Sequence, residues 1–230
     1  MTTRIKAHVQ SMTPLTNTIL KLILVPEVYQ DYQAGQYLQI ASHDTLFSYS
    51  IANAPLGSQT YELHLRHSRD NSQIEALLTE IQQSRSVRLQ MPLGQCHINR
   101  LDPLKPILFI AGGTGFSPIK AMIEQLLHNK EPRPFELFWT ARSQEDLYLH
   151  EQLAQWEEEI PHFHYVAYPS EHHKKSMIQT LLEKHHHDLA QWQYVISGPF
   201  DMVYALRTQL MAQGIARDAL FSDAFEGETS

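Results

Sequence analysis

The segment that constrains the fold most is Ile107–Lys120, which reads ILFIAGGTGFSPIK. A short apolar run leads into a glycine turn, and the turn leads into Ser117 and Pro118. The apolar run predicts a buried strand, while Ser117 as N-cap and Pro118 at the first position predict a helix start. Glycines would let a phosphate approach the backbone at the positive end of that helix. The segment matches neither GxGxxG nor GxxxxGK[ST], so the alternative is a tight turn without a ligand.

Strands and helices alternate from this segment onward. The expected strands are Ile107–Ala111, Phe135–Thr140, Phe163–Ala167, Tyr194–Ser197 and Ala219–Phe221. The expected helices are one that ends near Asn129, and Gln144–Glu158, Met177–His187 and Phe200–Gln213. This alternation predicts a doubly wound parallel sheet in an α/β domain at residues 102–230. Asp102-Pro103 and Lys105-Pro106 mark the connector that precedes it.

Residues 1–101 have the pattern of a second, mostly β domain. Short runs rich in β-branched or aromatic residues are Lys6–Gln10, Thr18–Val25, Gln36–Ala41, Phe47–Ala52, Thr60–His67 and Ser86–Gln90. Tyr61, Leu63 and Leu65 alternate with polar residues, which indicates one buried face. Asn71–Gln83 has apolar residues at helical spacing. We therefore expect an N-terminal antiparallel β-barrel with one helix.

Composition narrows the classes of function. The 230 residues carry a net charge of -7 with no basic block, which argues against nucleic-acid binding. The single cysteine, Cys96, excludes an internal disulfide and a four-thiolate iron–sulfur centre, and we expect it in a buried strand. No signal peptide or run of about 20 apolar residues is visible, so we expect a cytoplasmic protein that does not bind membranes.

Histidines cluster at His172-His173 and His185–His187. Such clusters can bind a metal adventitiously, but a solvated helix end is the simpler interpretation. We therefore predict no metal site.

Two further segments end strands with unusual residues. In FSYSIANAP, which begins at Phe47, Tyr49-Ser50 would suit a flat ring, because the aromatic packs on it and the hydroxyl reaches a polar edge. A core strand with a surface serine is the alternative. In VISGPF, Gly198-Pro199 is a common dipeptide in the turn that follows a strand. Its strand would nevertheless end at the same edge of the sheet as the glycine turn, where α/β proteins bind ligands.

Taken in order, YSIANAP, ELHLR, PLGQC, AGGTGFSPIK, FWTAR, SGPF and FSDAF resemble the ferredoxin-reductase superfamily. The sequence is most similar to bacterial NAD(P)H:flavin oxidoreductases and to the reductase modules of CDP-hexose deoxygenation and oxygenase systems. The resemblance covers nearly the whole chain. It implies an NAD(P)H-dependent reductase that transfers hydride to a weakly bound riboflavin, FMN or FAD.

The resemblance also implies roles for single residues. Tyr49 would stack on the isoalloxazine ring and Ser50 would hydrogen-bond near the flavin N5, which makes these two the candidate catalytic residues. The other candidates for flavin contact are Phe47, Ser48, His64, Leu65, Arg66 and Phe225. The candidates for NAD(P)H contact are Gly112, Gly113, Thr114 and Gly115 at the pyrophosphate, Arg142 at the adenosine ribose, and Ser197, Gly198 and Pro199 at the nicotinamide.

Three positions depart from the pattern of this superfamily. Phe47 stands where an arginine usually meets a flavin phosphate, and Ser68–Ser72 lacks the usual glycine. Both departures favour an exchangeable flavin, although Arg66 could partly replace the lost charge. Ser197 stands where a cysteine usually precedes Gly-Pro, and its hydroxyl can still hydrogen-bond.

Two alternatives stay open at this point. One is a reductase component that retains its flavin and passes electrons to a separate iron–sulfur protein or oxygenase. The other is a non-catalytic nucleotide-binding module. The sequence does not choose between NADH and NADPH, or name the electron acceptor or the oligomeric state.

Overall fold

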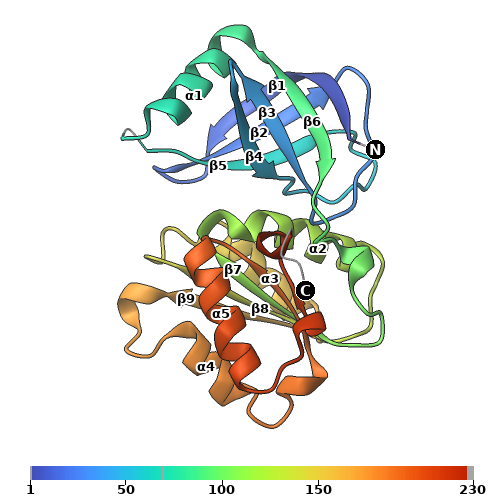
Figure 1. Ribbon diagram of the computed structural model, residues 1–230, viewed down its shortest axis with the longest axis vertical. Coiled ribbons are helices and arrows are strands. Elements are labelled where there is room, and N and C mark those ends of the chain that lie inside the picture. The colour runs from blue at the N-terminus through green and yellow to red at the C-terminus, as the bar shows by residue number, and fades with distance from the viewer. Residues whose placement is uncertain (1, 69, 227–230) are drawn as a thin grey trace.

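The computed structural model describes residues 2–68 and 70–226, which form two domains stacked end to end (Figure 1). The N-terminal domain contains a six-stranded antiparallel sheet with the order β4-β3-β6-β1-β2-β5. Its strands are β1 (Thr3–Pro14), β2 (Ile19–Pro26), β3 (Tyr37–Ser42), β4 (Thr45–Ser50), β5 (Tyr61–Arg66) and β6 (Ser86–Leu93). A bridge between Ile51 and Leu63 joins the two edges, so the sheet closes into the predicted barrel.

The barrel interior is filled by one face of each strand. Tyr61, Leu63 and Leu65 are fully buried, as their alternation with polar residues predicted. The opposite face of β5 is not simply solvated, because His64 is only 4% exposed. Helix α1 (Ser72–Ser84) begins after Asn71, whose side chain accepts a hydrogen bond from the Ile74 N–H at 3.2 Å.

The C-terminal domain is a five-stranded parallel sheet with the order β11-β10-β7-β8-β9. Its strands are β7 (Ile107–Gly112), β8 (Phe135–Ala141), β9 (Phe163–Pro169), β10 (Gln193–Ser197) and β11 (Leu220–Phe221), and its helices are α2 (Phe116–His128), α3 (His150–Glu159), α4 (Met177–Lys184) and α5 (Phe200–Ala212). Helices α2 and α3 share one apolar core with the sheet, and α4 and α5 share a second core with it. The doubly wound sheet is therefore confirmed.

Three helix ends differ from the sequence-based expectation. Helix α2 starts at Phe116 after a 3₁₀ turn at Gly113–Gly115, so Ser117 lies within the first turn and does not cap it. Helix α3 starts at His150, because the preceding residues form successive turns. Helix α4 stops at Lys184, since His185 turns inward toward Glu136, with its Nε2 2.9 Å from the carboxylate.

Two features of the fold frame the site. Strand β6 ends at Leu93 and β7 begins at Ile107, on either side of the predicted domain boundary after residue 101. The carboxyl ends of β7 and β10, which are neighbours in the sheet, both carry residues that line one cleft. Among the helices of the described residues, none combines the length and apolar character that crossing a membrane requires.

Candidate active site between the two domains

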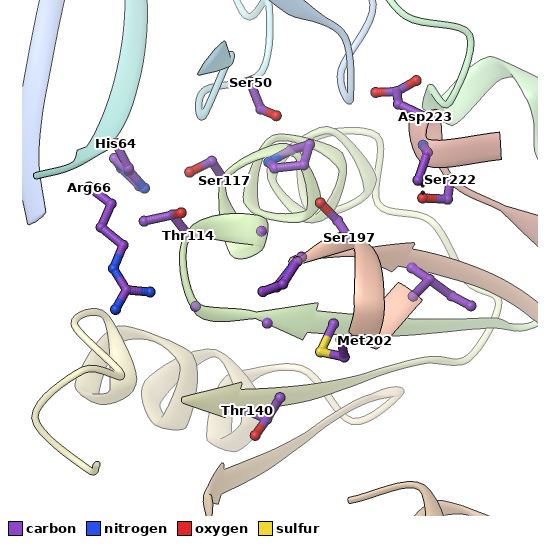
Figure 2. Close-up of a pocket in the computed structure, with 18 of the residues that line it drawn as sticks. Ser50, His64, Arg66, Thr114, Ser117, Thr140, Ser197, Met202, Ser222 and Asp223 are labelled. Atoms are coloured by element: carbon purple, nitrogen blue, oxygen red, sulfur yellow. Dashed lines mark hydrogen bonds between the residues drawn. The ribbon is translucent and has the colours of Figure 1, made fainter. Parts of the chain in front are cut away.

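A cleft of about 840 Å³ opens between the barrel and the parallel sheet. Ser48, Tyr49 and Ser50 line it from the end of β4, and His64 and Arg66 line it from β5. The opposite wall consists of Gly112–Gly115, Arg142 and Ser197–Pro199. Figure 2 shows Ser50 above Ser197, with the Arg66 side chain extending down past Thr114. Most of the residues predicted for two different ligands therefore face one shared space.

The glycine turn after β7 is tightly built. A Cβ at Gly115 would lie 2.3 Å from the Ser197 carbonyl oxygen, so a side chain at this position would force the two strand-end loops apart. Gly113 has φ +54° and its carbonyl oxygen accepts a hydrogen bond from Trp139 Nε1 at 2.9 Å. Packing thus requires glycine at 115, while Gly113 leaves the start of α2 open to an anionic ligand.

Arg66 extends from the barrel toward that turn. A Cβ at Gly113 would lie 4.0 Å from Arg66 Nη1, with no other atom within that distance. The guanidinium therefore lies at the junction between the flavin side and the nucleotide side of the cleft (Figure 2). A guanidinium in this position can pair with a phosphate group.

Tyr49 lines the cleft, packs against the barrel core and has an unsatisfied polar atom. Its Oη is buried and has no hydrogen-bond partner among the described residues. Burial raises the pKa of this phenol to about 12, so the hydroxyl stays protonated. A buried hydroxyl without a partner is costly.

Ser117 is a site residue that sequence reasoning assigned to a helix cap. Its side chain is only 2% exposed, lines the cleft and forms no hydrogen bond of normal geometry with the described residues. It lies close to Tyr148: burial raises the pKa of that phenol, and Ser117 partly offsets the rise. A serine two residues after a glycine turn was the available signal, because the first turn of such a helix faces the ligand edge of the sheet.

Three predicted flavin contacts do not line the cleft. Leu65 is fully buried in the barrel and Phe47 packs against the same core. The Phe225 ring lies 4.9 Å from the Arg207 guanidinium carbon and 4.6 Å from that of Arg217, inside the C-terminal domain. In the segment Ser68–Ser72, Arg69 lies outside the described residues.

The C-terminal residues close one side of the cleft instead. Asp223 lines it and accepts a hydrogen bond from the Cys96 N–H at 2.9 Å. Burial and the neighbouring Glu226 raise the pKa of this carboxyl. Cys96 lies in the loop after β6 and not in a strand, and burial raises its thiol pKa, which disfavours a nucleophilic thiolate.

The histidine clusters divide between core and surface. His185 is buried beside Glu136, so the expectation of a solvated helix end is wrong for this residue, whereas His186 and His187 are exposed. Across residues 2–68 and 70–226, the His, Cys, Asp and Glu side chains form no group of three or more placed to hold a metal ion.

Buried charges join the two domains beside the cleft. Lys120 on α2 is 5% exposed, and its Nζ donates to the Ala52 carbonyl at 2.9 Å and to Glu124 at 2.6 Å. The same nitrogen lies 3.2 Å from Glu62 on β5. Burial alone would raise the pKa of Glu62, but the hydrogen bond from His64 and the charge of Lys120 outweigh it and lower the pKa to about 2. Sequence reasoning missed this cluster, although Lys120 and Glu124 stand four residues apart on an otherwise apolar helix face.

Comparison with known proteins agrees with this geometry. Residues 109–208 match the family model described as the oxidoreductase NAD-binding domain. The match spans β7 to α5 and so includes the glycine turn and Ser197–Pro199.

Two curated relatives extend the likeness into the barrel. The chain is 31% identical over 212 residues to CDP-6-deoxy-L-threo-D-glycero-4-hexulose-3-dehydrase reductase of Yersinia pestis, which covers 90% of this chain and 64% of the relative. It is 26% identical over 233 residues to an NAD(P)H-flavin reductase of Vibrio harveyi. That alignment covers 96% of this chain and 98% of the relative.

The fold also matches a solved structure over nearly its full length. A ferredoxin NADP⁺ reductase from Neisseria gonorrhoeae superimposes with a TM-score of 0.80 at 18% identity, covering 96% of this chain and 97% of that one. The fold is therefore ferredoxin-reductase-like, and the resemblance inferred from the motifs is confirmed.

Proposed function

We propose that this protein is an NAD(P)H-dependent flavin reductase whose flavin exchanges with solution. One observation carries the proposal: the end of β4 with Tyr49 and Ser50 and the glycine turn after β7 open onto the same cleft. The full-length likeness to an NAD(P)H-flavin reductase supports it.

When bound, the nicotinamide would supply a hydride and the flavin would accept it. The residues of the cleft would align the two rings and exclude water. Tyr49 would pack on the flavin ring, and Ser50 would donate a hydrogen bond at its reacting edge. The start of α2 and Arg66 would hold phosphate groups, and Ser197 would border the nicotinamide. No side chain is required to take a proton in this step, which agrees with the lack of an acid–base pair among the predicted site residues.

Weak flavin retention follows from the charges around the flavin side. Phe47 packs against the barrel core and offers no charge to a flavin phosphate. Arg66 is exposed, so a phosphate held there would still be hydrated and weakly bound. We therefore infer that riboflavin, FMN and FAD enter and leave as substrates.

The adenosine end of the nucleotide would lie at Arg142, which follows β8 and lines the cleft with Asp146 and Ser170. The guanidinium would attract a 2′-phosphate and the carboxylate would repel it. Because these two effects oppose each other, both NADH and NADPH need to be tested as hydride donors.

The experiment is a matrix of NADH or NADPH with riboflavin, FMN or FAD, followed by the absorbance of the reduced nicotinamide. Desalted protein is expected to be colourless and to oxidise the nucleotide only when a flavin is added. Measurable nucleotide binding without turnover on any flavin would contradict the proposal and indicate a non-catalytic binding module.

A second candidate is a reductase component that keeps its flavin and passes electrons to a separate protein. The likeness to the Yersinia relative favours it, as does 28% identity over 216 residues to a terephthalate 1,2-dioxygenase reductase component of Comamonas. The chain spans 64% and 63% of the lengths of these two relatives. Desalted protein that remains yellow would select this candidate.

A further inference from the structure

A line of buried and half-buried side chains connects the flavin side of the cleft to the glycine turn. It consists of Glu62 and His64 on β5, Tyr148 just before α3, and Trp139 on β8, and we call these four residues the seam. None of them has a place in the mechanism above, although His64 lines the cleft.

The hydrogen-bond direction within the seam follows from its charges. His64 Nε2 lies 2.8 Å from Glu62 Oε1, and His64 Nδ1 lies 2.9 Å from the Tyr148 Oη. The low pKa of Glu62 keeps it an acceptor, and burial lowers the pKa of His64, so the imidazole is neutral. Nε2 then carries the proton, Nδ1 accepts, and the Tyr148 hydroxyl donates across the domain boundary.

Tyr148 connects His64 to the glycine turn through Trp139. Its ring stands edge-on against Trp139, with centroids 5.0 Å apart and an interplanar angle of 88°. Trp139 Nε1 donates to the Gly113 carbonyl at 2.9 Å. One continuous path of direct contacts therefore runs from barrel strand β5 to the phosphate-binding turn.

We propose that Tyr148 is a positioning residue, which sets the approach of the glycine turn to the barrel through its hydroxyl on His64 and its ring on Trp139. This role rests on the proposed function. Hydride transfer needs the reacting atoms about 3–3.5 Å apart, and a misplacement of about 1 Å can cost about 100-fold in rate. The Lys120 cluster holds the domains together, whereas Tyr148 is joined directly to a cleft-lining residue.

The test compares Tyr148→Phe with a matched control. Tyr165→Phe removes a similar hydrogen bond, from a tyrosine Oη to His150 Nδ1 at 3.2 Å, but within one domain. Tyr148→Phe keeps the ring against Trp139 and loses only the hydroxyl. We expect the rate at saturating substrate to fall about tenfold, with KM for NAD(P)H nearly unchanged, and we expect Tyr165→Phe to change neither.

A second readout does not depend on turnover. In the protein without ligands, Tyr148→Phe is expected to increase amide hydrogen exchange in both β5 and the Gly113–Gly115 turn, and Tyr165→Phe in neither. In a double variant with His64→Phe, Tyr148→Phe should cause little further loss of rate, because the two residues act through one bond.

The outcomes separate the two proposals. An active wild type whose Tyr148→Phe variant keeps its rate and its exchange pattern overturns the positioning role alone. Equal losses of rate in Tyr148→Phe and Tyr165→Phe also overturn it. A wild type without turnover on any flavin overturns the proposed function and the positioning role with it.

Discussion

Three of the hydroxyl-bearing residues that line the cleft lie where the two domains meet. Ser50 and Tyr49 come from the barrel, and Ser117 comes from the first turn of α2. The Tyr49 and Ser117 oxygens are buried without normal hydrogen-bond partners among the described residues. Buried polar groups are generally satisfied, so these two oxygens are exceptions within the cleft walls.

Ser50→Ala tests the group proposed at the reacting edge of the flavin. Loss of one hydrogen bond of about 1–1.5 kcal/mol is expected to slow flavin reduction about tenfold, while affinity for NAD(P)H changes little. Single-turnover kinetics under anaerobic conditions measure the step directly. An unchanged rate would remove Ser50 from the mechanism.

Arg66→Ala tests whether Arg66 supplies the positive charge that Phe47 does not offer to a flavin phosphate. Because FMN carries a phosphate and riboflavin does not, the variant should weaken FMN binding by about tenfold and riboflavin binding much less. Arg88→Ala, on the exposed side of β6, is the control. Equal losses for the two flavins would show that Arg66 does not contact the phosphate.

At the scale of elements, β5 and α2 form one of the contacts that join the domains. The alternation in β5 predicted which face enters the barrel, and the glycine-turn motif predicted α2 to within two residues of its start. The contacts between the two elements were not predictable, because Glu62 and Lys120 are 58 positions apart in sequence and their pairing depends on how the finished domains pack. The same reason explains why Phe225 lies away from the cleft, since its ring is held by Arg207 and Arg217 from α5 and the following loop.

Acid should weaken this junction. The pKa of Glu62 is about 2 in the folded protein against 4.5 for the ordinary side chain, so its contribution is complete above about pH 4.5 and is lost as the pH falls toward 2. Glu62→Gln should therefore lower stability by about 3 kcal/mol at neutral pH, and the difference from wild type should shrink in acid. Thermal unfolding between about pH 7 and about pH 3 measures it.

Glu27→Gln provides the control for that series. Glu27 also has a lysine and a histidine partner, with Lys6 at 3.4 Å and His8 at 3.7 Å, but all three side chains are about half exposed. Exposed pairs of this kind contribute about 0–1 kcal/mol. A Glu62→Gln effect that is as small as that of Glu27→Gln, or that is constant with pH, would contradict the assigned role of the junction.

At the scale of the whole molecule, the function depends on two unlike domains that share one cleft. Neither contains a complete site, since the barrel supplies the candidate surface for a flavin and the parallel sheet supplies that for a nicotinamide nucleotide. Periodicity and motifs were sufficient to predict both architectures, because each follows from local patterns along the chain. The relative placement of the domains had to come from the structure.

The most direct test of the account is anaerobic mixing of the protein with a flavin and with NADH or NADPH that carries deuterium at the transferable C4 position. The account predicts that the visible absorbance of the oxidised flavin is lost more slowly with the deuterated nucleotide and only when the protein is present. Flavin reduction that is independent of the protein, or a protein that binds both molecules without any transfer between them, would contradict it.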